Sequence, residues 1–399
     1  MGQHFIKKPF RILVAVKSTF KTHRTVIRAA AKYSQLNGSW SLYVLEGRDD
    51  ELELSQIDLN QFDGAVIYPT EQLSEFTQNL VLGRFDKPLL IIDPWYNVDF
   101  YEDICRQRNN ISVAWCDNRA IARQCAKFLL QKNLHNFAFV PVQPPKETLW
   151  SEERKLYFVE YLKRRNIQCD VFHTQEQNFE SQTILFQKWL RDLPKPIGIA
   201  AATDSVARRV VEGCLYDGIK IPDEAAVIGI DNDELICEST TPSISSLEND
   251  LEGTVVKLLE IMDRQIRGES FSGRTFYYEP ARIVERVSTQ MNITSDRTVI
   301  RSMELIRLNV GRPFGVAELA RHVNVSRRTL ELRFKKNLGK SVHDVIIETK
   351  LDKAKKLLCE SNLSIAEIAH SCGFSNENYF ATAFKRQYKL SPTSFRKIL

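Results

Sequence analysis

The sequence lacks the residue patterns of common catalytic and metal-binding sites. Its eight cysteines are scattered, without a C-x-x-C pair or a histidine at zinc-ligand spacing, so neither disulfides nor a zinc site are predicted. The motifs G-x-S-x-G and H-E-x-x-H are absent. Gly339-Lys-Ser matches the end of a phosphate loop, but Phe334 stands where the first glycine is needed. We therefore expect no enzyme, no metal and no cofactor.

Long apolar runs are absent as well. No stretch approaches the roughly 18 residues that cross a membrane. The apolar run at 12–16 is shorter than the roughly 7–15 apolar residues of an export signal. These absences predict a cytoplasmic protein without a membrane partner.

Net charge is also small, but it is unevenly distributed. The chain of 399 residues has 55 basic and 50 acidic side chains, a net charge of +5. Residues 1–289 carry 35 basic and 40 acidic side chains, whereas residues 290–399 carry 20 and 10. Such asymmetry is typical of a nucleic-acid-binding module joined to a domain of another kind. We predict two domains, 1–289 and 290–399.

The first domain has the pattern of repeated β-α units. Short apolar runs alternate with amphipathic helical segments, and near-continuous apolar strands such as Ala225-Ala-Val-Ile-Gly-Ile indicate parallel sheets covered on both faces. Two lobes of about 130 residues with a cleft between them fit the usual domain size. The expected strands are 11–16, 40–45, 64–68, 89–93, 112–116, 136–142, 198–203 and 225–230.

Ligands of such sheets bind beyond the carboxyl ends of the strands, so polar residues that follow strands are candidates. Carboxylates can bond the vicinal hydroxyls of a sugar, and an aromatic face can cover its apolar side. Helix capping is the alternative for each aspartate, and ordinary packing is the alternative for the tryptophan. The candidate ligand-binding residues are Ser18, Asp117, Trp150, Arg154, Asp204 and Asp231.

Residues 290–399 have helical patterns throughout and contain two similar segments. Ala317-Glu-Leu-Ala aligns with Ala366-Glu-Ile-Ala, and apolar residues recur at i, i+3 or i+4 on both sides of a short turn. Two helix-turn-helix units are therefore predicted, one at about 316–336 and one at about 364–386. The predicted core residues of their second helices are Leu330, Phe334, Phe380 and Phe384.

The opposite face of each second helix is free to enter the DNA major groove. Arginine can bond guanine in a bidentate fork, and asparagine can bond adenine in the same way. For each charged residue, a solvated helix face is the alternative. The candidate base-reading residues are Arg327, Arg328, Glu331, Asn376, Asn378 and Thr382; Lys335 and Lys385 are candidate phosphate contacts.

The second domain resembles the AraC family of transcription regulators over about residues 295–399. The resemblance is carried by Ile365-Ala-Glu-Ile-Ala, Cys372-Gly-Phe-Ser and the closing Ser391-Pro-Thr-Ser-Phe-Arg. It implies an all-α DNA-binding domain with two helix-turn-helix units.

The first domain resembles the two-lobed LacI-type sugar-binding domain, which is related to periplasmic binding proteins. Val227-Ile-Gly-Ile-Asp-Asn-Asp-Glu, Ala202-Thr-Asp and Asp117-Asn carry this resemblance. It implies Arg154, Asp204 and Asp231 as the first choices for sugar contacts. Lys17 and His23 depart from the family pattern in the first strand's loop.

Together the two resemblances imply a sugar-responsive transcriptional activator. D-xylose is the first candidate effector, and another pentose or a nucleoside is the alternative. The expected partners are operator half-sites on DNA, a second copy of the chain in a homodimer, and RNA polymerase. The rival hypothesis is a sugar-acting enzyme with a DNA-binding appendage.

Overall fold

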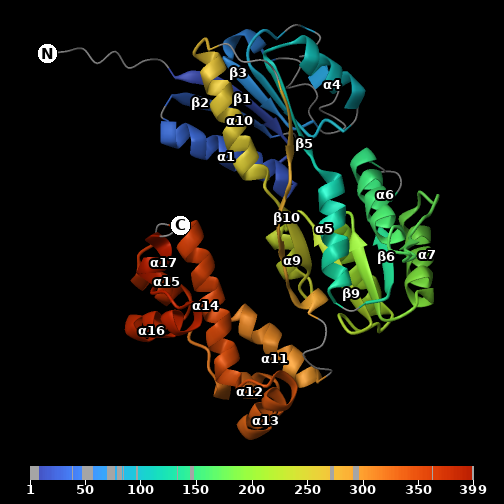
Figure 1. Ribbon diagram of the computed structural model, residues 1–399, viewed down its shortest axis with the longest axis vertical. Coiled ribbons are helices and arrows are strands. Elements are labelled where there is room, and N and C mark those ends of the chain that lie inside the picture. Colours follow the sequence, from blue (N-terminus) through green and yellow to red (C-terminus); the bar gives the residue numbers. More distant parts are fainter. Residues whose placement is uncertain are drawn as a thin grey trace, which may run out of the picture. The chain divides into compact units, whose positions relative to one another are not determined.

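A computed structural model describes the chain at residues 9–37, 39–46, 57–69, 77–78, 83, 85–95, 98–132, 134–143, 148–269, 274–290, 296–361 and 363–397. The chain divides into two compact units, an N-terminal unit that ends at Thr289 and a C-terminal unit that begins at Gln290 (Figure 1). In the described residues, the N-terminal unit is α/β with two sheets, and the C-terminal unit is all-α. The predicted fold class is confirmed.

The first lobe of the N-terminal unit is built on a parallel sheet with the strand order β11-β5-β4-β3-β1-β2. Its strands are β1 (Phe10–Val16), β2 (Trp40–Glu46), β3 (Gly64–Ile67), β4 (Leu89–Ile92), β5 (Ile111–Cys116) and β11 (Thr275–Tyr278). Its helical segments are α1 (Lys21–Asn37), η1 (Leu59–Gln61), α4 (Val98–Gln107) and α10 (Leu251–Ile266), of which α10 packs along α1 (Figure 1).

The second lobe has the strand order β12-β10-β9-β8-β6-β7, and only β12 pairs antiparallel among its described strands. Its strands are β6 (Asn136–Val140), β7 (Asp170–Val171), β8 (Ile197–Ala201), β9 (Ala225–Ile230), β10 (Ser245–Asn249) and β12 (Pro280–Val284). Its helical segments are α5 (Asn118–Leu130), α6 (Leu149–Lys163), α7 (Phe179–Asp192), α8 (Asp204–Tyr216), α9 (Glu234–Ser239) and η2 (Val287–Thr289).

The chain crosses between the lobes after β5, after β10 and between β11 and β12. The crossing segments are hydrogen-bonded to one another: the amide of Asp117 donates to the carbonyl of Tyr278, and the amide of Asp250 donates to the carbonyl of Glu279, both at 3.0 Å. Because all three crossings lie near the carboxyl ends of the central strands, residues that follow those strands face the junction of the lobes.

The helical patterns predicted for the C-terminal unit correspond to seven helices among its described residues, of which the last is short. They are α11 (Arg297–Leu308), α12 (Val316–His322), α13 (Arg327–Leu338), α14 (Val342–Glu360), α15 (Ile365–Ser371), α16 (Glu377–Tyr388) and α17 (Pro392–Lys397). The four predicted core residues of α13 and α16 are completely buried.

Helix α14 joins two hydrophobic cores. Val342 and Ile346 pack with α11, α12 and α13, whereas Leu351 and Leu358 pack with α15 and α16. The two helix-turn-helix units also approach closely at Gly373, which follows α15, where a Cβ atom would lie 2.3 Å from the carbonyl oxygen of Arg312. The two helix-turn-helix units are therefore held together by one helix and by close backbone packing.

Candidate functional site

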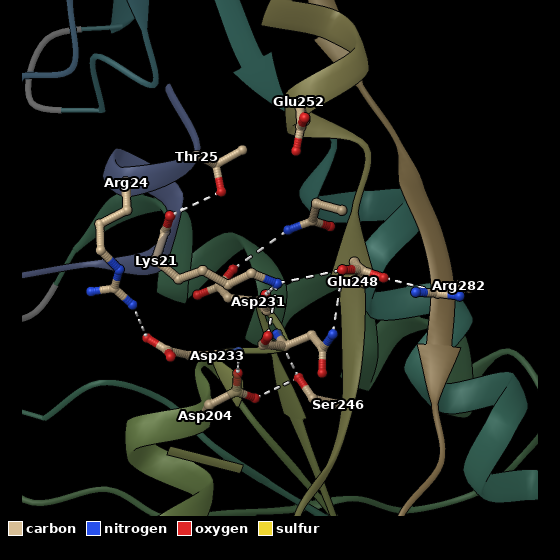
Figure 2. A network of polar contacts seen from close by, with 12 residues as sticks. Lys21, Arg24, Thr25, Asp204, Asp231, Asp233, Ser246, Glu248, Glu252 and Arg282 are labelled. Atoms are coloured by element: carbon tan, nitrogen blue, oxygen red, sulfur yellow. Dashed lines mark hydrogen bonds and ion pairs between the residues drawn. The ribbon is translucent and has the colours of Figure 1, made fainter. Parts of the chain in front are cut away.

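Polar side chains of both lobes meet at the carboxyl ends of the two sheets (Figure 2). The ammonium group of Lys21, at the start of α1, donates to the carbonyl oxygens of Asp231 at 2.9 Å and Asn232 at 2.7 Å, and lies 3.5 Å from the carboxylate of Glu248. One turn later, Arg24 pairs with Asp233 at 2.9 Å. These contacts join α1 of the first lobe to the turn after β9 of the second lobe. Sequence reasoning missed both cations, although a cation in the first turn of a helix opposes the helix dipole and signals an acidic partner elsewhere.

The turn that receives these cations has an uncommon backbone conformation. Asp231 and Asn232 have φ angles of 98° and 50°, a region that Asp and Asn enter more readily than most residues. Asp204 stabilises this turn through two hydrogen bonds. One of its carboxylate oxygens accepts the amide of Asp233 at 2.6 Å, and the other accepts the hydroxyl of Ser246 at 2.5 Å. Only 1% of Asp204 is exposed. Of the two predicted sugar contacts here, Asp204 therefore supports the turn, whereas Asp231 lies on it.

Arg154 is a buried cation at the junction of the lobes. Its guanidinium donates to the side-chain oxygen of Asn118 at 2.9 Å and to the carbonyl of Ala202 at 2.6 Å, and it contacts the thiol of Cys116. The guanidinium carbon lies 4.7 Å from the ring centroid of Trp150, so the two predicted residues stack on each other. Because Cys116 ends a strand of the first lobe and Ala202 follows one of the second, Arg154 contacts both lobes.

A second buried carboxylate, Asp93, was not predicted. Its oxygens accept hydrogen bonds from the hydroxyls of Tyr68 and Tyr278 and from the amide of Cys116. Burial raises the pKa of Asp93, although these hydrogen bonds oppose the increase. Asp93 directly follows β4 and therefore meets the criterion that selected the other candidates. It was missed because the predicted strand, 89–93, extended through it.

His23 lies beside this cluster. Its ring stacks on the ring of Tyr68 at 3.8 Å between centroids, and its Nδ1 accepts the amide of Lys17 at 3.0 Å. Burial, followed by the nearby charges of Lys17 and Arg24, lowers the pKa of His23 to about 3. A neutral histidine therefore shapes the loop that carries the predicted residue Ser18, whose carbonyl accepts Arg24 at 3.1 Å.

Asp117 and Asn249 occupy two of the crossings between the lobes. The carboxylate of Asp117 accepts the amide of Ala120 at 2.8 Å and caps α5, which is the capping role considered for it. Asn249 was missed because it ends β10, a strand too polar to be recognised. Its amide nitrogen lies 3.4 Å from the carboxylate of Asp231, and its buried Oδ1 has no hydrogen-bond partner among the described residues.

The protonation of Asp204 should make the stability of the N-terminal unit depend on pH. Burial, and then repulsion by Asp231, raises the pKa of Asp204 to about 8, far above the roughly 3.9 of an aspartate in an unfolded chain. Between these values the native state binds a proton that the unfolded state releases, so the free energy of unfolding decreases as pH rises toward and through 8.

We therefore expect the melting temperature to fall from pH 7 to pH 9, and Asp204→Asn, which is neutral throughout, to make this fall smaller. Buried cysteines such as Cys125 and Cys214, whose pKa burial raises to about 12, contribute the rest of the fall in both proteins. Tryptophan fluorescence measures it selectively, because all five tryptophans precede residue 290. The pH 7–9 interval keeps His23 out of the measurement, since its folded and unfolded pKa values are both lower. An unchanged pH dependence in Asp204→Asn would contradict the assignment.

The second helices of both helix-turn-helix units present exposed faces of mostly polar and basic residues. On α13, Arg327, Arg328, Lys335 and Lys336 are exposed, and at the start of and along α16 the exposed residues are Asn376, Asn378, Thr382, Lys385 and Arg386. Two exposed apolar residues on these helices, Leu332 at 62% and Tyr379 at 44%, were not predicted. Apolar contacts of this kind are suited to thymine methyl groups.

Other candidates on these helices have partners within the unit. Glu331 accepts the amide of Val342 at 3.1 Å, and Asn376 accepts the amides of Asn378 and Tyr379 as the cap of α16. Lys335 donates to the carbonyl of Gly339 at 3.2 Å. Because Glu331 is partly buried and supports the start of α14, its carboxylate is a less available base reader than the neighbouring arginines.

The described residues contain neither a metal-binding cluster nor a membrane-spanning helix. No group of three or more His, Cys, Asp or Glu side chains is arranged to hold a metal ion. No described helix is both long and apolar enough to span a membrane.

Comparisons with known proteins agree with the two-domain architecture. Residues 126–289 match the periplasmic binding protein-like domain family, and residues 319–398 match a helix-turn-helix domain family. The xylose operon regulatory protein of Haemophilus influenzae is 29% identical over 379 residues, covering 90% of this chain and 96% of that protein. The xylose operon regulatory protein of Escherichia coli K12 is 26% identical over 396 residues, 98% of each chain.

The similarity extends to a solved structure of the same kind. The xylose-binding transcription activator XylR superposes with a TM-score of 0.61 and 26% identity, covering 98% of this chain and 99% of that one. The resemblance inferred from the sequence is thus confirmed for both domains and for their order along the chain.

Proposed function

Because the chain is a homologue of the xylose operon regulatory proteins along nearly its whole length, we propose that it is a sugar-responsive transcriptional activator of D-xylose catabolic genes. The observation that carries this proposal is the similarity across both domains in a single chain. A sugar-binding domain or a helix-turn-helix domain alone would fit many functions.

The effector site that we propose lies at the junction of the lobes, where polar groups of both sheets converge. Asp231 and Asn249 offer hydrogen-bond acceptors, Arg154 offers donors, and the ring of Trp150 offers a face for the apolar side of the sugar. Ser18 contributes from the first lobe and Asp117 from the crossing after β5, and Asp204 acts by fixing the turn of Asp231.

The DNA-binding surface is formed by α13 and α16. Arg327, Arg328, Asn378 and Thr382 read base edges, with smaller contributions from Glu331 and Asn376, whose side chains already have partners in the protein. Lys335 and Lys385 contact phosphates. The 19 residues of α14 span about 28 Å, at roughly 1.5 Å per residue, close to the roughly 34 Å between major-groove turns on one DNA face.

The regulator acts in the cytoplasm as a homodimer on two operator half-sites and contacts RNA polymerase. It is not an enzyme, and it needs no cofactor. D-xylose changes the populations of open and closed lobes by binding one state more tightly than the other, and its effect on DNA binding is limited by that difference in affinity.

Titration of the full-length protein tests this function. D-xylose should change tryptophan fluorescence saturably, while L-arabinose, D-ribose and adenosine should act only at much higher concentration. A fluorescent duplex selected by the protein from random sequence should then bind with a different Kd when D-xylose is saturating. A response to a nucleoside alone would contradict the effector, and conversion of D-xylose, followed by NMR, would favour the enzyme hypothesis.

A further inference from the structure

The last residues of the N-terminal unit are firmly embedded in the second lobe. Ser288 and Thr289 are completely buried in the segment η2, although both are polar. Buried polar groups are costly unless they are hydrogen-bonded, so the partners of this segment determine how rigidly it is held. The chain continues from here to the C-terminal unit.

Buried hydroxyl groups fasten this segment to β9 and β10. The hydroxyl of Ser288 accepts the amide of Ser245 at 2.8 Å and donates to the carbonyl of Val227 at 2.6 Å. The hydroxyls of Ser245 and Thr289 are 2.7 Å apart, and the amide of Arg286 donates to the hydroxyl of Ser245 at 2.7 Å. The segment must therefore move with the sheet of the second lobe.

The side chain of Arg286 extends from this segment to the turn at the junction of the lobes. One guanidinium nitrogen donates to the carbonyl of Ile244 at 3.0 Å, and another donates to the side-chain oxygen of Asn232 at 2.9 Å. Arg286 is 9% exposed, and its ion pair with Glu238 at 3.7 Å lies on the solvent side. The planar guanidinium of Arg286 thus links the turn of residues 231–233 to the last residues of the N-terminal unit.

Asn232 itself is bonded to both lobes. Its amide donates to the hydroxyl of Ser246 at 2.9 Å, and its side-chain amide donates to Glu248 at 3.3 Å, both in the second lobe. Its carbonyl accepts Lys21 of the first lobe at 2.7 Å. A change in the distance between the lobes therefore acts on the residue that Arg286 holds.

We propose that Arg286 is the positioning residue that couples the turn of residues 231–233 to residues 286–289. Through it, effector binding between the lobes alters the segment from which the chain leads to its DNA-binding unit. This inference rests on the proposed function and adds the residue that transmits the response. Replacing Arg286 should therefore leave sugar binding intact while abolishing the response of residues 286–289 to the sugar.

Hydrogen–deuterium exchange of the full-length protein with and without saturating D-xylose tests the coupling, because it reports local opening at each amide. The variants are Arg286→Gln, which loses the charge, and Arg286→Lys, which keeps the charge but cannot span both acceptors. The matched control is Glu285→Gln, since Glu285 pairs with Lys132 at 2.5 Å instead of contacting the turn.

In the wild type and in Glu285→Gln, D-xylose should slow exchange about fivefold or more in peptides covering residues 231–236 and 284–290. In both Arg286 variants, the first peptide should keep its protection while the second loses it. If Arg286→Gln does not fold, Arg286→Lys alone tests whether residues 284–290 lose their protection by the sugar.

Protection of both peptides in a folded Arg286 variant would overturn the inference, as would protection of residues 231–236 alone in the wild type. A purely structural role would raise exchange equally with and without sugar and would also overturn it. If D-xylose protected neither peptide in the wild type, the proposed effector itself would be wrong, and the inference would fall with it.

Discussion

Asp231→Asn should weaken D-xylose binding about ten- to hundredfold while leaving the affinity for DNA in the absence of sugar unchanged. The carboxylate lies on the turn between the lobes, and its one described side-chain partner, Asn249, is 3.4 Å away, so most of its acceptor capacity remains for a ligand. Hydrogen bonds to a charged group contribute about 1.5–3 kcal/mol, which corresponds to the expected loss. Fluorescence titration with D-xylose gives the affinity directly.

The choice of asparagine matters because Asp231 has a φ of 98°. Alanine is strained in that region and would disturb the turn as well as remove the carboxylate, whereas asparagine enters it more readily. Burial raises the pKa of Asp231, whereas the charges of Arg154 and of Lys21, which holds the turn, lower it and so favour the charged form that asparagine replaces.

Asp117→Asn is the matched comparison, because Asp117 has a capping role that asparagine can take over equally well. If Asp117 also contacts the sugar through its charge, this variant should lower the affinity for D-xylose without lowering the melting temperature. An unchanged affinity would leave Asp117 as a cap alone. An unchanged affinity in Asp231→Asn would contradict the placement of the effector site.

The fold class was predictable because its central strands carry a strong signal. Strands such as β1 and β9 are apolar and buried on both faces, and the sequence around them alternates with amphipathic helices. In contrast, β10 has the mostly polar sequence Ser245-Ser-Leu-Glu-Asn. Its two serines can be buried because the hydroxyl of Ser246 bonds Asp204 and the hydroxyl of Ser245 bonds the 286–289 segment. Such a strand depends on partners far away in the chain, so no local pattern indicates it.

The same distinction applies to the candidate site. Asp231 could be found from its position after a buried strand, which is a local rule. For Lys21 and Arg24 the sequence indicates only that cations near the start of a helix need partners, because the groups that they contact lie more than 200 residues later in the sequence. The distinction between Asp204 as a support and Asp231 as an available acceptor likewise required the three-dimensional arrangement of their hydrogen bonds.

The affinity for DNA should fall about a thousandfold between 50 and 200 mM salt, whereas the affinity for D-xylose should not change. Each phosphate contact releases counterions, and about six contacts give a loss of this size. Besides the base-reading arginines, the exposed faces of α13 and α16 carry four cations in each chain, namely Lys335, Lys336, Lys385 and Arg386, so the proposed homodimer offers up to eight phosphate contacts. A neutral sugar releases no counterions, so its binding should not depend on salt. The two titrations together therefore distinguish the salt-dependent binding of the C-terminal unit from the salt-independent binding of the N-terminal unit.

Two variants of α13 distinguish a phosphate contact from a general effect of charge. Lys336 is exposed, and Lys336→Gln should reduce the slope of log K against log salt by about one for each DNA-bound subunit, and therefore by about two for the proposed homodimer. The guanidinium of Arg333 is instead held by Asp296 at 3.0 Å and by Thr298 at 2.7 Å, so Arg333→Gln should leave the slope unchanged. Equal reductions in both variants would mean that the total charge of the C-terminal unit, rather than particular contacts on its second helices, determines the salt dependence.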